Sequence, residues 1–330
     1  MRFVIHGAGA VGGVIGGRLH QAGHDVTLVA RGEHLRSLQR GGLTVRSPDA
    51  TVTLPVPAVA SPADAGLADG DVVVLAVKSQ HTAAAVADLA RVAPPGIAVV
   101  CAQNGVANEL VALRAFARVH AMVVMLPATH LEPGAVDAWC SPVTGLLDLG
   151  RYPHGVDATS EAVAAALREA TFSSQARPDI MRWKYRKLLL NLANAVEAVA
   201  AADGAAGELV ARLVAEGEDV LRAAGIDCAS VDEDAERRRD LPRIRPIEGR
   251  RRQGGSSWQS LARGHDTIET DHLNGEIVLL GRLHGVPTPA NELLQRLARG
   301  LAAEGRPPGS LAAGEVLARL DGADRPPHRS

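Results

Sequence analysis

Residues 3–12 read FVIHGAGAVG, and this stretch decides the fold. A short apolar strand leads into a G-x-G-x-x-G turn made by Gly7, Gly9 and Gly12, and residues 10–22 follow as a predicted helix. Strand, glycine turn and helix in this order are typical of a dinucleotide-binding site. Gly7 permits the tight turn, Gly9 lets the backbone approach a pyrophosphate, and Gly12 lets the helix pack on the strand.

The helix that follows the turn begins at Ala10 and Val11. Its first N–H groups have no partner within the helix and lie at its positive end, so they can hold phosphate oxygens. A glycine-rich turn without a ligand is the alternative interpretation. The strand and helix that flank the motif favour the dinucleotide site.

The rest of the first half alternates strands with helices. Apolar, β-branched runs predict strands buried on both faces, as in a parallel sheet, at 26–29, 72–77, 97–102 and 121–125. Helices are predicted at 33–39, 82–91, 107–115 and 158–170, with a β-rich insert at 43–45 and 52–59 and an edge strand at 172–176. This pattern predicts an α/β fold with an N-terminal Rossmann-type, doubly wound sheet.

Beyond residue 178 the pattern becomes helical, with helices predicted at 183–202, 207–224 and 267–284. We therefore expect an all-α C-terminal domain. The predicted domains are 1–177 for NADP binding and 178–304 for substrate and catalysis. Because residues 305–330 contain several prolines, we predict a mostly unpacked tail with at most one short helix.

Composition excludes several classes of function. The 330 residues carry 35 basic and 37 acidic side chains, so the chain is not a generally basic nucleic-acid binder. No apolar run is long enough to suggest a membrane span. Three widely spaced cysteines form no disulfide framework and no zinc motif, which favours a reduced, cytoplasmic setting. The histidines of the first half lack metal-ligand spacing, and we predict no metal site.

The end of the second predicted strand indicates the cofactor. NAD sites usually place an acid there to hold the ribose 2′-hydroxyl, whereas this strand ends Val29-Ala30-Arg31. Arg31 can hold a 2′-phosphate, so the sequence favours NADP over NAD. A solvated arginine is the alternative. Lys78 and Asn104 follow the next two buried strands, at the carboxyl edge where such sheets bind ligands. The alternative for Asn104 is that its Asn-Gly pair only forms a turn in the loop.

The second half contains two further candidate groups and an arginine-rich segment. Lys187 and Asn191 are four residues apart and share one face of a predicted helix. A desolvated lysine there suits a general acid, although a lysine that reaches to the surface fits the pattern slightly better. Glu269 lies near the start of a predicted helix, where an acid either stabilises the helix dipole or enters a site.

The arginine-rich segment lies between these two groups. Its arginines lie at positions 237, 238, 239, 243, 245, 250, 251 and 252. Interrupting acids favour a solvated or subunit-facing role over an anion or nucleic-acid site.

In order, the motifs are GAGAVGG, VARGEHL, AVKSQ, QNGV, WKYRKLLLN and SSWQSLARGHDTIETDHLNGEIVLLGRLHGVPTP. Together they resemble the ketopantoate reductase (2-dehydropantoate 2-reductase) family over about residues 1–300. The lysine–asparagine helix and the segment with serine, Glu-x-Asp and Asn-Gly are the specific parts of the resemblance.

The resemblance implies NADPH-dependent reduction of a 2-oxo acid to a 2-hydroxy acid, on the route to pantothenate. It implies that Lys187 is the general acid that protonates the developing alkoxide and that Glu269 orients the substrate hydroxyl and the lysine. Asn104 and Asn191 would donate hydrogen bonds and Ser257 would meet the substrate carboxylate, in a cleft between the domains. Lys78 matches the family lysine near the nicotinamide.

Two departures from the family pattern bear on the substrate. Ala195 and Ala206 stand where the family usually has asparagine. A paralogue that reduces another 2-oxo acid or a ketone therefore stays open, as do a non-catalytic NADP-binding sensor and an isomerase or epimerase that keeps its cofactor. A methyltransferase is disfavoured because no acid follows the second strand. The helix face at 275–283 and the arginine-rich segment are the candidate contacts of a homodimer.

Overall fold

The computed structural model describes residues 1–201, 203–239, 243–250, 252, 254–264 and 268–323. The chain divides into two compact units. Unit 1 is Met1–Lys184 with Ala229–Arg252, and unit 2 is Tyr185–Cys228 with Gln253–Ser330. This division differs from the predicted boundary after residue 177, because Ile180 and Trp183 pack against Ala121 and Val123 of unit 1.

Unit 1 is built on a sheet whose strands are parallel except for the edge strand β11. Within the described residues it has seven strands. Their order across the sheet is β11 (Leu149–Arg151), β8 (Arg118–Met122), β7 (Ala98–Cys101), β6 (Val72–Leu75), β1 (Arg2–His6), β2 (Asp25–Val29) and β5 (Ala58–Val59). The chain moves outward from β1 in both directions, so the strand order reverses there, as in a doubly wound sheet. The predicted fold class is confirmed.

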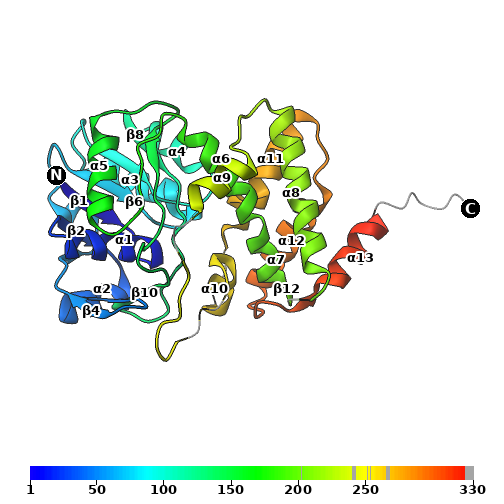
Figure 1. The fold of residues 1–330 in the computed structure, drawn as a ribbon, viewed down its shortest axis with the longest axis horizontal. Coiled ribbons are helices and arrows are strands. Elements are labelled where there is room, and N and C mark those ends of the chain that lie inside the picture. The colour runs from blue at the N-terminus through cyan, green and yellow to red at the C-terminus, as the bar shows by residue number, and fades with distance from the viewer. Residues whose placement is uncertain (202, 240–242, 251, 253, 265–267, 324–330) are drawn as a thin grey trace, which may run out of the picture. The chain divides into compact units, whose positions relative to one another are not determined.

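Helices cover both faces of this sheet (Figure 1). The helices α1 (Ala10–Gln21) and α5 (Ala158–Glu169) contribute to one apolar core, and α3 (Thr82–Ala90) and α4 (Asn108–Leu113) to another. The sheet strands between them are fully buried, which explains their unbroken β-branched sequences. The short helix α2 (Gly32–Gly41) follows β2, and the 3₁₀ turn η1 (Pro62–Ala65) follows β5.

The predicted β-rich insert forms β5 of the large sheet with its residues 58–59 and supplies two strands of a second, smaller sheet. Its strands are ordered β4 (Thr51–Leu54), β3 (Leu43–Arg46), β10 (Ala135–Ala138) and β9 (Ala128–Thr129). Gly13 and Gly17 of α1 face this sheet, where an added Cβ would lie 2.7 Å from Val136 and Val45 respectively. The helix α1 therefore packs against both sheets. The predicted edge strand at 172–176 is not continuous, since residues 173 and 176 make isolated parallel bridges to Leu146 and Leu149.

The arginine-rich segment belongs to unit 1. Most of its described arginines are exposed, which agrees with the predicted solvated role, but Arg237 and Arg250 are partly buried in ion pairs. The segment begins in helix α9 (Val231–Arg238). Arg237 reaches the buried Asp148 at 2.6 Å, and Arg250 pairs with Glu132 at 2.9 Å and with Asp137 at 3.1 Å. Arg237 and Arg250 thus bind the segment to acidic residues of unit 1 that lie about a hundred residues away in sequence. Arg251 lies outside the described residues.

Unit 2 is helical, as predicted. Its helices are α6 (Ile180–Asn191, which begins in unit 1), α7 (Ala193–Val199), α8 (Ala206–Ala223), α10 (Ser256–Ala262), α11 (Asn274–His284), α12 (Pro289–Ala303) and α13 (Ala313–Ala323). A pair of two-residue strands, β12 (Ala200–Ala201) and β13 (Leu311–Ala312), joins distant parts of the unit. None of the helices in the described part of the chain has the length and apolarity needed to cross a membrane.

Two helix predictions in unit 2 need correction. The predicted helix at 183–202 breaks at Leu192. There the backbone makes hydrogen bonds that span three residues, as in a 3₁₀ turn: Leu192 N–H donates to Leu189 O, and Ala195 N–H donates to Leu192 O. The predicted helix at 267–284 is shorter: a 3₁₀ turn, η3 (Glu269–His272), precedes α11, and residue 267 lies outside the described residues.

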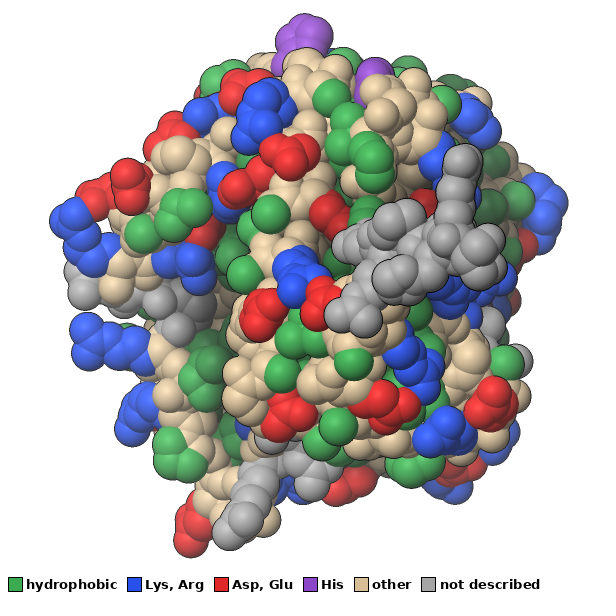
Figure 2. All heavy atoms as spheres, turned by 90° about the vertical axis from the view of Figure 1, so that its right-hand side faces the viewer, with side chains coloured by type: hydrophobic (Ala, Val, Ile, Leu, Met, Phe, Trp, Pro, Cys, Tyr) green, Lys and Arg blue, Asp and Glu red, His purple; other side chains and the backbone are tan. Residues whose placement is uncertain are grey.

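The predicted tail is partly ordered. Helix α13 packs on α8, where Arg212 pairs with Asp321 at 2.7 Å. Figure 2, which views the right-hand side of Figure 1, shows acidic and basic side chains intermixed over this face. An amphipathic stretch with Val316, Leu317 and Leu320 buried explains why the tail folds up to this point. Residues 324–330 of the predicted tail lie outside the described residues.

Candidate active site

The glycine turn adopts the backbone that its sequence predicts. Gly7 has φ +108°, and a Cβ there would lie 2.8 Å from the Val77 nitrogen. A Cβ on Gly12 would lie 2.1 Å from the Gly7 oxygen, so only glycine lets α1 pack this closely. The N–H groups of Gly7 and Ala8 donate to Val29 O at the end of β2. The turn is therefore held against the two strands whose ends form the candidate dinucleotide site.

Gly9 differs from its neighbouring glycines because nothing in the chain lies near its missing side chain. A Cβ built there has no atom within 4 Å, so packing within the chain does not require glycine at this position. Gly9 is also the N-cap of α1, and no side chain caps the helix or places an acid in its first turn. An uncapped helix N-terminus beside open space fits a bound pyrophosphate.

Arg31 extends from the end of β2 with 76% of its side chain exposed. Its guanidinium lies 3.4 Å from Asp88 of α3, and Arg91 lies 2.5 Å from the same carboxylate. His6, at the end of β1, is buried among these charges. Burial, and to a lesser extent the neighbouring Arg31, lower the pKa of His6 to about 4. Two arginines and one acid therefore lie where the predicted 2′-phosphate would bind.

His34 of α2 fixes the glycine turn, a role that the sequence did not suggest. Its Nε2 lies 2.8 Å from Ala8 O, and its Nδ1 accepts the Gly134 N–H at 2.9 Å. Only the neutral ring with hydrogen on Nε2 satisfies both bonds. Burial lowers the pKa of His34, which favours this neutral form.

Lys78 and Asn104 lie on loops that a buried hydrogen-bond network joins. Lys78 precedes the 3₁₀ turn η2 (Ser79–His81), and Asn104 follows β7. The Asn104 carbonyl accepts from Asn108 Nδ2 at 2.9 Å and from Ser79 Oγ at 3.2 Å. Thr82 Oγ1 donates to Asn108 Oδ1 at 2.7 Å and accepts from Gln103 Nε2 at the same distance. The structure thus brings the two predicted loops together.

The candidate residues of the second half all lie in unit 2. Lys187 is partly exposed on α6, and Asn191, the last residue of that helix, is buried. The tight turn at Leu192 follows directly, so α6 ends at the second of these two side chains. Ala195 is buried on α7, and Ala206 is the first residue of α8.

Ser257 and Glu269 are buried in separate elements, α10 and η3, at 1% and 4% exposure. The Ser257 hydroxyl has no hydrogen-bond partner among the described residues. Glu197 of α7 accepts the Gly255 N–H at 2.7 Å and so holds the start of α10. A buried hydroxyl without a partner is a candidate contact for a polar ligand.

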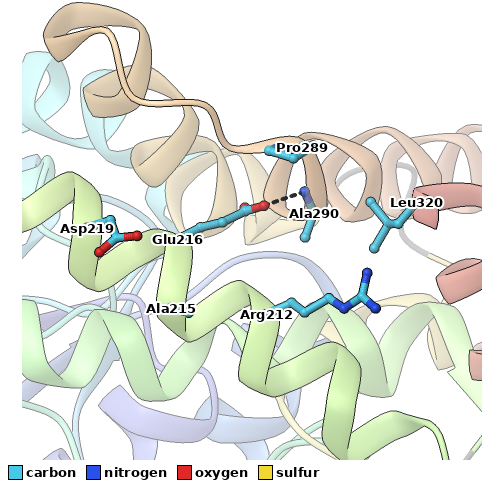
Figure 3. A pocket seen from close by; sticks show the side chains of 7 residues that line it. All are labelled: Arg212, Ala215, Glu216, Asp219, Pro289, Ala290 and Leu320. Carbon is cyan, nitrogen blue, oxygen red and sulfur yellow. Dashed lines mark hydrogen bonds between the residues drawn. The ribbon is translucent and has the colours of Figure 1, made fainter. Parts of the chain in front are cut away.

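A cavity of about 260 Å³ lies elsewhere in unit 2, between α8, the start of α12 and α13 (Figure 3). Its lining includes Arg212, Asp219 and Glu216, and Glu216 accepts the Ala290 N–H at 2.7 Å and thereby caps α12. None of the predicted site residues lines it. Among the described residues, no group of three or more His, Cys, Asp or Glu side chains is placed to hold a metal.

Comparison with known proteins places these features in a family. The family described as Ketopantoate reductase PanE/ApbA matches residues 3–147, and its C-terminal counterpart matches residues 179–302. A 2-dehydropantoate 2-reductase of Halobacterium salinarum is 32% identical over 91% of this chain and 98% of that protein. The chain belongs to the ketopantoate reductase family.

Solved structures agree with this membership. A PanE/ApbA family ketopantoate reductase from Ralstonia eutropha has a TM-score of 0.77 and 30% identity, with 92% of this chain and 99% of that one covered. A D-mandelate dehydrogenase solved with NADH and anilino(oxo)acetate has a TM-score of 0.80 at 24% identity, over 92% and 99% of the two chains, and shows the shared fold. Family membership makes the chain a Rossmann-fold oxidoreductase that acts on CH–OH groups.

Proposed function

We propose that the protein reduces a 2-oxo acid of the ketopantoate type to the 2-hydroxy acid with NADPH, and that Lys187 supplies the proton. The observation that carries the proposal is the uncapped N-terminus of α1 beside the open space at Gly9, in a chain of this family. Its relatives in Halobacterium salinarum and Archaeoglobus fulgidus, at 32% and 31% identity, are named 2-dehydropantoate 2-reductase.

The cofactor would be held by unit 1. Gly7, Gly9, Ala10, Val11 and Gly12 would hold the pyrophosphate. Arg31 would pair with the 2′-phosphate, which supports NADPH over NADH because a guanidinium binds phosphate oxygens bidentately. Lys78 and Asn104 would lie toward the nicotinamide. When bound, the reduced nicotinamide supplies the hydride that adds to C2 of the substrate.

The residues of unit 2 would complete the reduction. As the carbonyl C=O π bond opens, negative charge develops on oxygen, and Lys187 Nζ donates a proton to it. Glu269 would orient the substrate hydroxyl and the lysine, and Asn191 and Ser257 would hold the substrate through hydrogen bonds. The Ser257 hydroxyl is buried without a partner among the described residues, which supports a role in holding a polar group.

A steady-state assay tests this proposal. The loss of reduced-nicotinamide absorbance is followed with ketopantoate, then with a panel of other 2-oxo acids and ketones, using NADPH and NADH in parallel. We expect turnover of ketopantoate with NADPH preferred. Turnover only with another member of the panel would replace ketopantoate by that substrate. Tight NADPH binding without any turnover would overturn the proposal in favour of a sensor.

A further inference from the structure

Lys184 is a buried lysine at the start of α6 whose ammonium group is surrounded by acceptors. Its side chain is 2% exposed, and Nζ lies 2.5 Å from Oε1 of Glu109, which is fully buried. Nζ also donates to Gln103 O at 2.9 Å and to Met122 O at 3.3 Å. Two hydrogen bonds and one ion pair thus converge on the ammonium group.

These acceptors lie at the carboxyl edge of the large sheet. Gln103 directly precedes Asn104, Met122 ends β8, and Glu109 lies in the first turn of α4. One lysine side chain thus joins α6 to the ends of two neighbouring strands and to the loop that holds Asn104.

The same helix carries Lys187. The two lysines are three residues apart on α6, about one turn or 4.5 Å along its axis. The helix is continuous from Ile180 to Asn191 and so includes both lysines. Because successive turns of an α-helix are rigidly coupled, whatever fixes Lys184 fixes the turn from which Lys187 extends.

A buried ion pair is weak support for stability, because its desolvation cost offsets much of the attraction. Lysine is also rare in this chain. Only three of the 35 Lys and Arg residues are lysines, namely Lys78, Lys184 and Lys187. Arginine serves the other basic positions, including the ion pairs of the arginine-rich segment. A compact ammonium group that contacts two backbone carbonyls and one carboxylate at one point suits a role in positioning.

We propose that Lys184 and Glu109 form a positioning pair, which holds the helix turn below Lys187 and the loop of Asn104 in their working places. Its consequence for catalysis rests on the proposed function, in which Lys187 donates the proton. Neither member is assigned a contact with substrate or cofactor. The pair acts through the backbone of α6 and through the carbonyl of Gln103.

The decisive variant is Lys184→Met with Glu109→Leu, which removes both charges at similar volume and leaves no buried charge unpaired. A purely structural pair predicts an unchanged kcat. The positioning pair predicts a kcat lowered about tenfold or more, with the NADPH Kd and the thermal midpoint close to wild type. A matched control is Arg2→Met with Asp71→Asn, an ion pair of 2.5 Å at the amino edge of the same sheet, which should leave kcat unchanged.

A second variant covers the case in which the first does not fold. Glu109→Asp keeps both charges but moves the carboxylate back by one carbon–carbon bond. We expect it to fold and to lower kcat several-fold, because the anchor point is displaced while the charge balance stays the same. A wild-type kcat in this variant, or in the charge-free double variant, would overturn the positioning role.

Lysine NMR gives a readout that does not depend on turnover. Protein labelled with [ε-¹³C]lysine has three side-chain signals, and the Lys187 signal is assigned with Lys187→Ala. The proposal predicts a displaced Lys187 signal in the charge-free double variant and an unmoved one in the Arg2–Asp71 control. If the wild type reduces no oxo acid, the proposed function is wrong, and the NMR signal alone tests whether the Lys184–Glu109 pair positions Lys187. An unmoved Lys187 signal in the charge-free double variant would then overturn the positioning role.

Discussion

His34 Nε2 donates to the carbonyl of Ala8 at 2.8 Å, so a side chain of α2 fixes the middle of the glycine turn. Loss of this bond should loosen the turn before any cofactor binds. We predict that His34→Ala raises the NADPH Kd about tenfold, equivalent to the ~1.4 kcal/mol of one hydrogen bond, and changes kcat little. Titration by nicotinamide fluorescence measures it. An unchanged Kd would show that the turn holds its shape without His34.

Arg31 should decide between NADPH and NADH. Arg31→Ala removes the proposed partner of the 2′-phosphate, so we expect KM for NADPH to rise about tenfold or more, with KM for NADH unchanged. Asp88→Asn is the matched control, because it frees Arg31 from its 3.4 Å ion pair and should lower KM for NADPH or leave it unchanged. Equal effects of Arg31→Ala on both cofactors would contradict this assignment.

Buried histidines should make the protein less stable in acid. Burial lowers the pKa of His6 from 6.5 to about 4, so above pH 6.5 the ring is neutral in both the folded and unfolded states. As pH falls from 6.5 toward 4, the unfolded state binds the proton first, and the free energy of unfolding decreases. The full loss from His6 is about 3 kcal/mol. Denaturant unfolding of His6→Leu should show a smaller decrease over this range than wild type, and an identical decrease would contradict the assignment.

The arginine-rich segment should stabilise unit 1 through its buried pairs. Arg237→Ala leaves Asp148, 1% exposed, with Arg177 as its remaining cationic partner, and we expect a loss of about 2–3 kcal/mol in the free energy of unfolding. Arg245→Ala breaks a pair with Asp49 in which both side chains are more than half exposed, and should cost less than about 1 kcal/mol. Equal losses in the two variants would contradict the difference in burial.

Local sequence patterns were enough to predict the large sheet, its glycine turn and the helical second half. The glycine turn could be predicted because Gly7 and Gly12 meet local steric needs, such as the close approach of Gly12 to Gly7. The break at Leu192 was missed, since no proline or glycine marks it and the apolar pattern continues through it.

The remaining features depend on contacts between residues far apart in sequence. Gln103, Thr82 and Asn108 form a buried network across 21 to 26 residues, and Arg237 meets Asp148 across 89. No spacing rule links such positions. Lys184 was missed for the same reason: its partner Glu109 lies on another helix, and beside Lys187 it resembles one more basic residue of an amphipathic helix.

The central claim is that Lys187 supplies the proton to the reduced carbonyl. The most direct measurement compares kcat/KM for the oxo acid in wild type and Lys187→Ala, with NADPH saturating and its Kd measured separately. A general acid predicts a fall of about 100-fold or more in kcat/KM with the NADPH Kd unchanged. A Lys187→Ala protein that keeps the wild-type kcat/KM would contradict the claim.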